Sequence, residues 1–139
     1  MDNLTPQQRR RNMQRVRASG TQAELLARRL LRKNKLYFAT NVVSLPGKPD
    51  IVFRKKRIAV FIDSDFWHCH PTRFTMPKSN AQYWVCKIAK NVDRDRRVDK
   101  ELASIGWKVI RIWEYDLLTN PGKSISRVIK LVRRSKVSH

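Results

Sequence analysis

The chain has 139 residues, enough for one modest hydrophobic core, and its 31 Lys and Arg against 11 Asp and Glu give a net charge of +20 at pH 7. Such a charge favours a polyanionic partner, above all nucleic acid, but does not separate binding from catalysis. No stretch has membrane-spanning length, no signal-peptide pattern opens the chain, and two cysteines make no disulfide framework. We therefore expect a cytoplasmic, nucleoid-associated protein with a basic N-terminal arm over residues 1–18 and a single folded domain over residues 19–139.

The segment after the arm reads as a helix followed by a strand. Residues 21–34 have helical spacing, and Thr21 is placed to cap the N-terminus of this helix. Residues 36–43 are rich in aromatic and β-branched side chains, which favours a strand. The prolines and glycine of residues 44–49 then end the strand. The leucines expected to face inward from the helix are Leu26, Leu30 and Leu31.

The middle of the chain has the pattern of a β-hairpin. Residues 50–53 and 57–63 are short, apolar and β-branched, and a basic turn separates them. A loop of aromatic and polar residues follows over 64–78. The hairpin therefore leads directly into a segment that is rich in side chains with chemical function.

A long helix, a strand and a basic helix complete the chain. The long helix is expected over residues 79–104 with Gly106 placed to end it, the strand over 107–113 and the basic helix over 124–134. The order α-β-β-β-α-β-α is typical of an α/β fold with a mixed central sheet flanked by helices. The residues expected on the inward stripe of the long helix are Trp84, Ile88, Val92, Asp95, Val98, Leu102 and Ile105.

One carboxylate interrupts this apolar stripe. Asp95 has Asn91, Val92, Val98 and Asp99 as its helical neighbours three and four positions away. None of these neighbours is basic, so a surface ion pair along the helix is not available. An inward acid without a local cation usually meets a histidine, a metal or a buried arginine, and we therefore expect a functional role for this residue.

Three further acids lie at the ends of expected elements. Asp50 begins the first hairpin strand, Asp63 ends the second, and Glu24 lies in the first turn of the first helix. Thr21 and Glu24 also have capping-box spacing, and the other two acids are placed where turn and cap residues occur. Together, however, such acids supply oxygen ligands that can hold Mg²⁺ against a phosphate, which phosphodiester cleavage needs.

Two histidines follow the hairpin closely. His68 is the natural base for activating water, because imidazole titrates near neutrality and a carboxylate such as Asp95 can fix its tautomer. A structural zinc bound by His68, His70 and the cysteines is the alternative. Neither cysteine has a partner at CxxC spacing, so we expect no structural zinc.

Large aromatic rings accompany these histidines. Phe66 and Trp67 lie in the polar loop, where such rings either pack under a neighbour or wedge between the base steps of a nucleic acid. Trp84 is open to both interpretations. For Trp107 and Trp113 we expect packing in the core.

Five stretches of the chain stand in an order typical of a known nuclease family. They are RRRNMQRVRASGTQAE, SLPGKPDIVF, VFIDSDFWH, YWVCKIAKNVDRDRR and GWKVIRIWE. Through them most of the chain resembles the very short patch repair (Vsr) DNA mismatch endonucleases, a branch of the PD-(D/E)XK nuclease superfamily. The resemblance implies the restriction-endonuclease-like fold of that superfamily and a Mg²⁺-dependent nuclease, in which Mn²⁺ can substitute.

The resemblance also implies a role for each acid of the site. Asp50 and the backbone carbonyl of Ile62 would hold the metal, with Asp63 as a further candidate ligand, and Glu24 would reach the metal through water. His68 would activate the attacking water. The catalytic residues that match the family's pattern are Glu24, Asp50, His68 and Asp95, the last of which would orient the histidine.

The resemblance further implies how DNA is held. Three aromatic side chains of the family enter the duplex beside the mismatch, and they match Phe66, Trp67 and Trp84. The N-terminal arm is similar to one that clasps the minor groove, with Met13 at the position of its apolar wedge. The basic side chains also expected to contact DNA are Arg15, Lys90, Arg94, Arg96 and Arg97.

The chain departs from the family at its zinc site. Asp65 and Tyr115 stand at two positions where the family usually has zinc ligands, and His70 is a possible remnant, so the expectation of no zinc stands. Vsr-like homing endonucleases of phages or introns share the catalytic set but cut both strands. Mismatch nicking, site-specific double-strand cleavage and non-catalytic nucleic-acid binding therefore stay open, for a monomer or weak dimer that acts on double-stranded DNA with repair or recombination factors.

Overall fold

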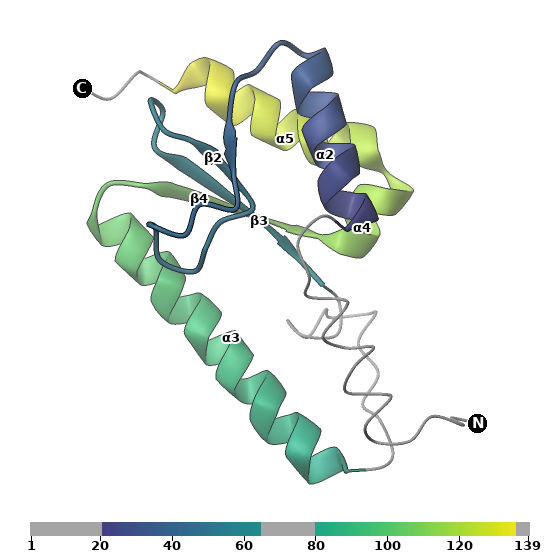
Figure 1. Cartoon of the computed structure of the whole chain (residues 1–139), viewed down its shortest axis with the longest axis vertical. Coiled ribbons are helices and arrows are strands. Elements are labelled where there is room, and N and C mark those ends of the chain that lie inside the picture. Colours follow the sequence, from purple (N-terminus) through teal and green to yellow (C-terminus); the bar gives the residue numbers. More distant parts are fainter. Residues whose placement is uncertain (1–20, 65–79, 136–139) are drawn as a thin grey trace.

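The structure is a computed structural model of the chain, and it describes residues 21–64 and 80–135. The predicted arm over residues 1–18 lies outside these ranges. The described residues form a mixed α/β fold whose elements follow one another in a single unit (Figure 1). These elements are α2 (Gln22–Lys33), β1 (Ala39–Thr40), β2 (Ile51–Phe53), β3 (Ile58–Asp63), α3 (Ala81–Ser104), β4 (Lys108–Trp113), α4 (Glu114–Thr119) and α5 (Pro121–Arg134).

The four strands form one mixed sheet in the order β1-β2-β3-β4. The first three strands pair antiparallel, and β4 pairs parallel to β3 with Phe61 opposite Arg111 and Asp63 opposite Trp113. A parallel partner needs a crossover connection, and α3 lies in the segment that joins β3 to β4. The predicted mixed sheet with flanking helices is therefore confirmed, with α4 as an additional helix between β4 and α5.

Helices cover both faces of the sheet (Figure 1). On one face α2 and α5 pack with Ile58 and Val60 in the larger core cluster. On the other face Ala59 and Phe61 pack with Val98 and Leu102 of α3, and Trp107 lies against this second cluster as expected. Because alternate residues of β3 serve the two clusters, β3 is buried on both faces and forms the centre of the fold.

Helix α2 turns a somewhat different face to the core from the one that we expected, and α3 departs from its expected stripe at one position. In α2 the buried apolar residues are Ala23, Ala27 and Leu31, whereas Leu26 and Leu30 are only half-buried. The alanines at four-residue spacing let the helix backbone approach its neighbours closely. In α3, Ile105 is 51% exposed because the helix ends at Ser104.

The expected strand over residues 36–43 is much shorter in the structure. Only Ala39 and Thr40 pair with β2, opposite Val52 and Ile51 respectively. Asn41 has a positive φ of 49°, which bends the backbone out of the strand.

Within the described residues, no helix is both long enough and apolar enough to cross a membrane.

Gly47 fixes the loop between β1 and β2 against α3. Its φ is +77°, and a Cβ built on it would lie 2.6 Å from Val98 Cγ1 and 3.1 Å from Phe61 Cε1. We expect Gly47→Ala to lower the free energy of unfolding by about 2–4 kcal/mol, because strain and overpacking add. Gly122→Ala is the matched control, since nothing lies within 4 Å of its Cβ, and it should leave stability equal or slightly raised. Chemical denaturation measures both, and equal stability for the two variants would contradict this packing.

Candidate active site

The candidate site is a cavity of about 710 Å³ at one end of the sheet. The antiparallel pairing of β2 with β3 brings the start of β2, where Asp50 lies, next to the end of β3, where Ile62 and Asp63 lie. The first turn of α2 contributes Glu24, and the middle of α3 contributes Asp95. All five described residues that the sequence predicts for catalysis or metal binding therefore line one cavity.

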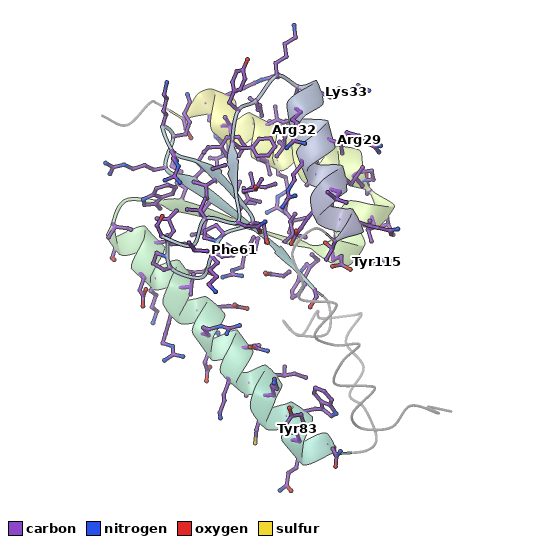
Figure 2. All side chains as sticks on the ribbon, viewed as in Figure 1. Arg29, Arg32, Lys33, Phe61, Tyr83 and Tyr115 are labelled. Atoms are coloured by element: carbon purple, nitrogen blue, oxygen red, sulfur yellow. The ribbon has the colours of Figure 1, made fainter. Side chains whose placement is uncertain are left out.

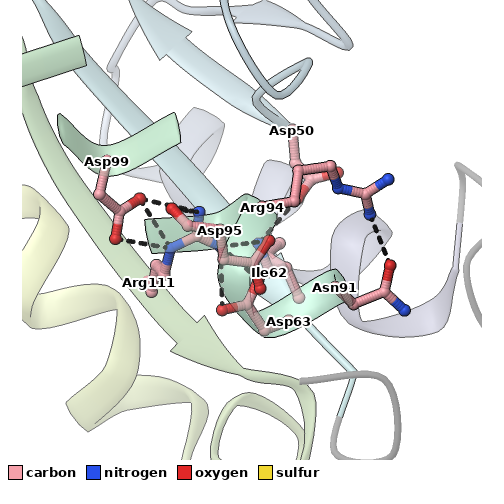
Figure 3. A network of polar contacts seen from close by, with 8 residues as sticks. All are labelled: Asp50, Ile62, Asp63, Asn91, Arg94, Asp95, Asp99 and Arg111. Carbon is pink, nitrogen blue, oxygen red and sulfur yellow. Dashed lines mark hydrogen bonds and ion pairs between the residues drawn. The ribbon is translucent and has the colours of Figure 1, made fainter. Parts of the chain in front are cut away.

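Asp50 is a strongly perturbed carboxylate of the site. Its Oδ2 accepts a hydrogen bond of 2.7 Å from the backbone N–H of Ile62, so the side chain is fixed across the hairpin (Figure 3). Burial, with smaller contributions from the neighbouring carboxyls of Glu24 and Asp63, raises the pKa of Asp50 to about 7, although the Ile62 N–H opposes the shift. A carboxyl of this kind is unfavourable when it is charged and alone, and a bound cation would relieve it.

This raised pKa predicts the pH dependence of stability without divalent cations. The pKa of Asp50 rises from 3.8 to about 7 on folding, so its contribution to stability is complete below pH 3.8 and is lost as the pH rises towards 7. We expect the loss to be at most about 4 kcal/mol over this window. Urea unfolding in EDTA, compared between wild type and Asp50→Asn, isolates the effect. A difference between the two proteins that does not vary from pH 4 to pH 7 would contradict it.

Glu24 combines two roles that the sequence left open. Its backbone N–H donates to Thr21 Oγ1 at 3.3 Å, which confirms the cap of α2. Its carboxylate is buried, contacts Arg28 Nη2 at 3.5 Å and lies close enough to Asp50 to raise the pKa of that group. Beside its part in the cap, Glu24 lines the cavity.

Arg111 of β4 was not predicted as a site residue, and it joins two acids of the site, Asp63 and Asp95, to Asp99. Its Nη1 lies 2.9 Å from Asp63 Oδ1 and 3.8 Å from Asp95 Oδ1, and its Nη2 lies 2.8 Å from Asp99 Oδ1 (Figure 3). Asp95 therefore points inward, as its place in the stripe predicted, and one of its partners is a partly buried arginine. The alternation of β4 could have predicted this role of Arg111. It places Arg111 on the same face as Val109 and hence against α3.

The donors around Asp50 fit a hard divalent cation. Among residues 21–64 and 80–135, no three acidic, histidine or cysteine side chains converge as a metal cluster. Mg²⁺, however, usually binds through one or two carboxylates and completes its shell with water and substrate phosphate. Asp50 with Glu24 supplies this smaller set, and a cation beside Asp50 would oppose the rise in pKa that burial causes.

Several predicted residues have no described geometry. The residues that lie outside the described ranges, and whose roles stay predictions, are Met13, Arg15, Phe66, Trp67, His68 and His70.

Trp84 is 3% exposed and meets Tyr83 edge-on, with ring centroids 4.9 Å apart. It would have to leave this buried position to enter a duplex.

The predicted basic residues of α3 are exposed. Lys90, Arg94, Arg96 and Arg97 all reach solvent, and Arg94 also lines the cavity and donates to Asn91 Oδ1 at 3.0 Å. A second cavity of about 790 Å³ along the first half of α3 is lined in part by Lys90 and Arg94. Arg94 therefore lies beside the acidic site, and Lys90 lies with it along the second cavity.

A strongly basic α/β protein with carboxylates gathered in one cavity has the features of an enzyme that acts on nucleic acid. Residues 1–73 match the family model described as DNA mismatch endonuclease Vsr. The chain belongs to this family, and the predicted class of DNA endonuclease is thereby confirmed.

Three relatives illustrate the similarity. The type II nicking enzyme V.NmeDIP of Neisseria meningitidis serogroup C is 37% identical over 135 residues, which cover 96% of this chain and 91% of the relative. The type II nicking enzyme V.NaeI of Lentzea aerocolonigenes is 42% identical over 115 residues, covering 79% and 69%. The DNA mismatch endonuclease Vsr of Escherichia coli K12 is 37% identical over 107 residues, covering 76% and 69%.

Proposed function

We propose that this protein is a Mg²⁺-dependent endonuclease that nicks one strand of duplex DNA at or near a T:G mismatch. The observation that carries the proposal is the placement of Asp50 and Glu24 in one cavity, with the pKa of Asp50 raised to about 7. The mixed α/β sheet with flanking helices supports the superfamily fold that we propose.

The residues of the site divide the chemistry among them. When bound, Mg²⁺ would supply positive charge that stabilises the phosphate and the leaving oxygen. Asp50 and the carbonyl of Ile62 would hold it, and Glu24 would hold its water shell. His68 would take the proton of the attacking water while Asp95 orients the imidazole ring.

The relatives support nicking and a mismatch more than double-strand cleavage. Several curated relatives that cover most of the chain are named as nicking enzymes, and another is named as a mismatch endonuclease. The departures at the zinc positions do not argue against nicking. Tyr115 lies exposed on α4, and the absence of structural zinc stays a prediction that metal analysis of the purified protein can check (Figure 2).

A cleavage assay on labelled duplexes tests the proposal. Two duplexes that differ only in one T:G or T:A pair carry a different fluorophore on each strand, and cleavage is followed in Mg²⁺, in Mn²⁺ and in EDTA. We expect one cut strand, a strong preference for the T:G duplex, and no cutting in EDTA. Because the target sequence is unknown, the mismatch is placed in a set of different flanking sequences.

Each alternative gives a distinct result. Cutting of both strands of matched duplexes at particular sites would favour a homing-type endonuclease. Binding without cutting in every cation and sequence would favour a non-catalytic binding domain.

Three further expectations also stay predictions: the cytoplasmic, nucleoid-associated location, the monomer or weak dimer, and the repair or recombination factors.

A further inference from the structure

Arg111 is enclosed by carboxylates and an aromatic ring. Its Nη1 donates to both Asp63 oxygens, at 2.9 and 3.2 Å, and its Nε and Nη2 donate to Asp99 Oδ1 at 3.0 and 2.8 Å. Its Nη2 also lies 3.5 Å from the backbone carbonyl of Asp95. The face of the guanidinium lies 4.3 Å from the centroid of Phe61, its partner across the β3–β4 ladder. These contacts leave the guanidinium little freedom to move.

Among the described residues, Arg111 contacts more carboxylates than one guanidinium can neutralise. One guanidinium faces three carboxylates, and the side chain of Asp63 is only 8% exposed. Burial by itself would lower the pKa of Arg111, but Asp99, Asp63 and Asp95 together raise it. Without Arg111, at least one buried carboxylate would face its like-charged neighbours without this cation, which strongly destabilises a folded protein.

The site therefore has two differently neutralised halves. Both oxygens of Asp63 accept hydrogen bonds from the same nitrogen, Nη1 of Arg111, while the Nε and Nη2 of that guanidinium donate to Asp99. Asp50 instead accepts from a neutral backbone N–H and has Glu24 as an acidic neighbour. A divalent cation gains more beside Asp50, because Asp63 already pairs with the Arg111 guanidinium, whereas the cation of the other half, Arg28, pairs with Glu24.

We propose, on the basis of the function proposed above, that Arg111 is a positioning residue that holds Asp63 out of the cation's coordination shell and fixes Asp95 beside the cavity. Asp63 then acts through Arg111, and the earlier expectation that it is a metal ligand is replaced by a supporting role. Asp99 completes the arrangement from the exposed end of the guanidinium.

Cation binding separates this proposal from a ligand role for Asp63. Mn²⁺ binding to the protein–DNA complex is followed by the electron paramagnetic resonance signal of free Mn²⁺. Asp63→Asn should keep its Mn²⁺ dissociation constant within about threefold of wild type, whereas Asp50→Asn should raise it by about tenfold or more. Arg111→Met should bind additional Mn²⁺, because it exposes carboxylates that the guanidinium neutralised. A loss of binding in Asp63→Asn as large as that in Asp50→Asn would overturn the proposal.

Cleavage kinetics test the positioning role. Arg111→Met should lower kcat by about tenfold or more with little change in the KM for DNA, and Arg111→Lys should fall between it and wild type, because it keeps the charge and loses the fork. Arg54→Met is the matched control, since Arg54 is exposed at the opposite end of the hairpin, and it should behave as wild type. A kcat for Arg111→Met within twofold of the control would overturn the role.

Thermal unfolding in EDTA keeps the proposal testable if the protein proves not to cleave DNA. The changes in unfolding midpoint caused by Asp63→Asn and Arg111→Met should not add in the double variant. Asp63→Asn should recover part of the midpoint that Arg111→Met loses. Additive changes in midpoint would contradict the proposed pairing of Arg111 with Asp63, whether or not the wild type cleaves DNA. A wild type that neither binds Mn²⁺ nor nicks DNA would instead count against the proposed function.

Discussion

Asp50→Asn is expected to lower the rate of nicking by about a thousandfold or more, the largest effect of any described side chain. The substitution removes the charge that would hold the cation, yet its amide oxygen can still accept the 2.7 Å hydrogen bond from Ile62 N–H. The local fold should therefore survive. Affinity for duplex DNA should stay equal or increase, because one negative charge near the phosphates is lost.

Single-turnover cleavage and a binding titration measure the two sides of this prediction. Asp116→Asn is the control, because Asp116 is exposed on α4 and lines neither cavity. It should cut at the wild-type rate. An Asp50→Asn protein that nicks DNA at a similar rate to Asp116→Asn would show that the cavity is not the active site.

His68→Ala is expected to slow nicking by about a hundredfold to ten-thousandfold, as loss of a general base does. The variant should recover part of its rate at high pH, where hydroxide replaces the water that needs a base. His70→Ala is the matched control two residues further along the same segment, and it should stay close to the wild-type rate. The reverse result, with only His70→Ala inactive, would favour a zinc or structural role for this histidine pair.

Local sequence patterns predicted most of the helices and strands. The hairpin follows from two β-branched runs around a short basic turn, and α3 follows from a long stripe that ends before Gly106 with its φ of +85°. The strand β1 is short because Asn41, with its φ of 49°, bends the backbone out of it, which the apolar pattern of residues 36–43 did not indicate. The parallel pairing of β4 beside β3 is a long-range choice that no local pattern encodes.

The site was predicted in its acids but not in the cation that organises them. Asp95 was predicted to meet a partner from another element, and Asp99 lies one turn further along the same helix. Both acids pair with Arg111, which lies in phase with the inward residues of β4. The pairing could not be read from the sequence, because it depends on the packing of α3 against β4.

The central claim is that Asp50 lies at the cation site and Asp63 does not. The most direct measurement is anomalous X-ray diffraction from crystals of the protein–DNA complex soaked in Mn²⁺. The predicted result is a peak at bonding distance from a carboxylate oxygen of Asp50 and the backbone carbonyl of Ile62, with Asp63 still paired to Arg111. A peak coordinated by Asp63, or no peak beside Asp50 in a complex that still cleaves DNA in Mn²⁺, would contradict it.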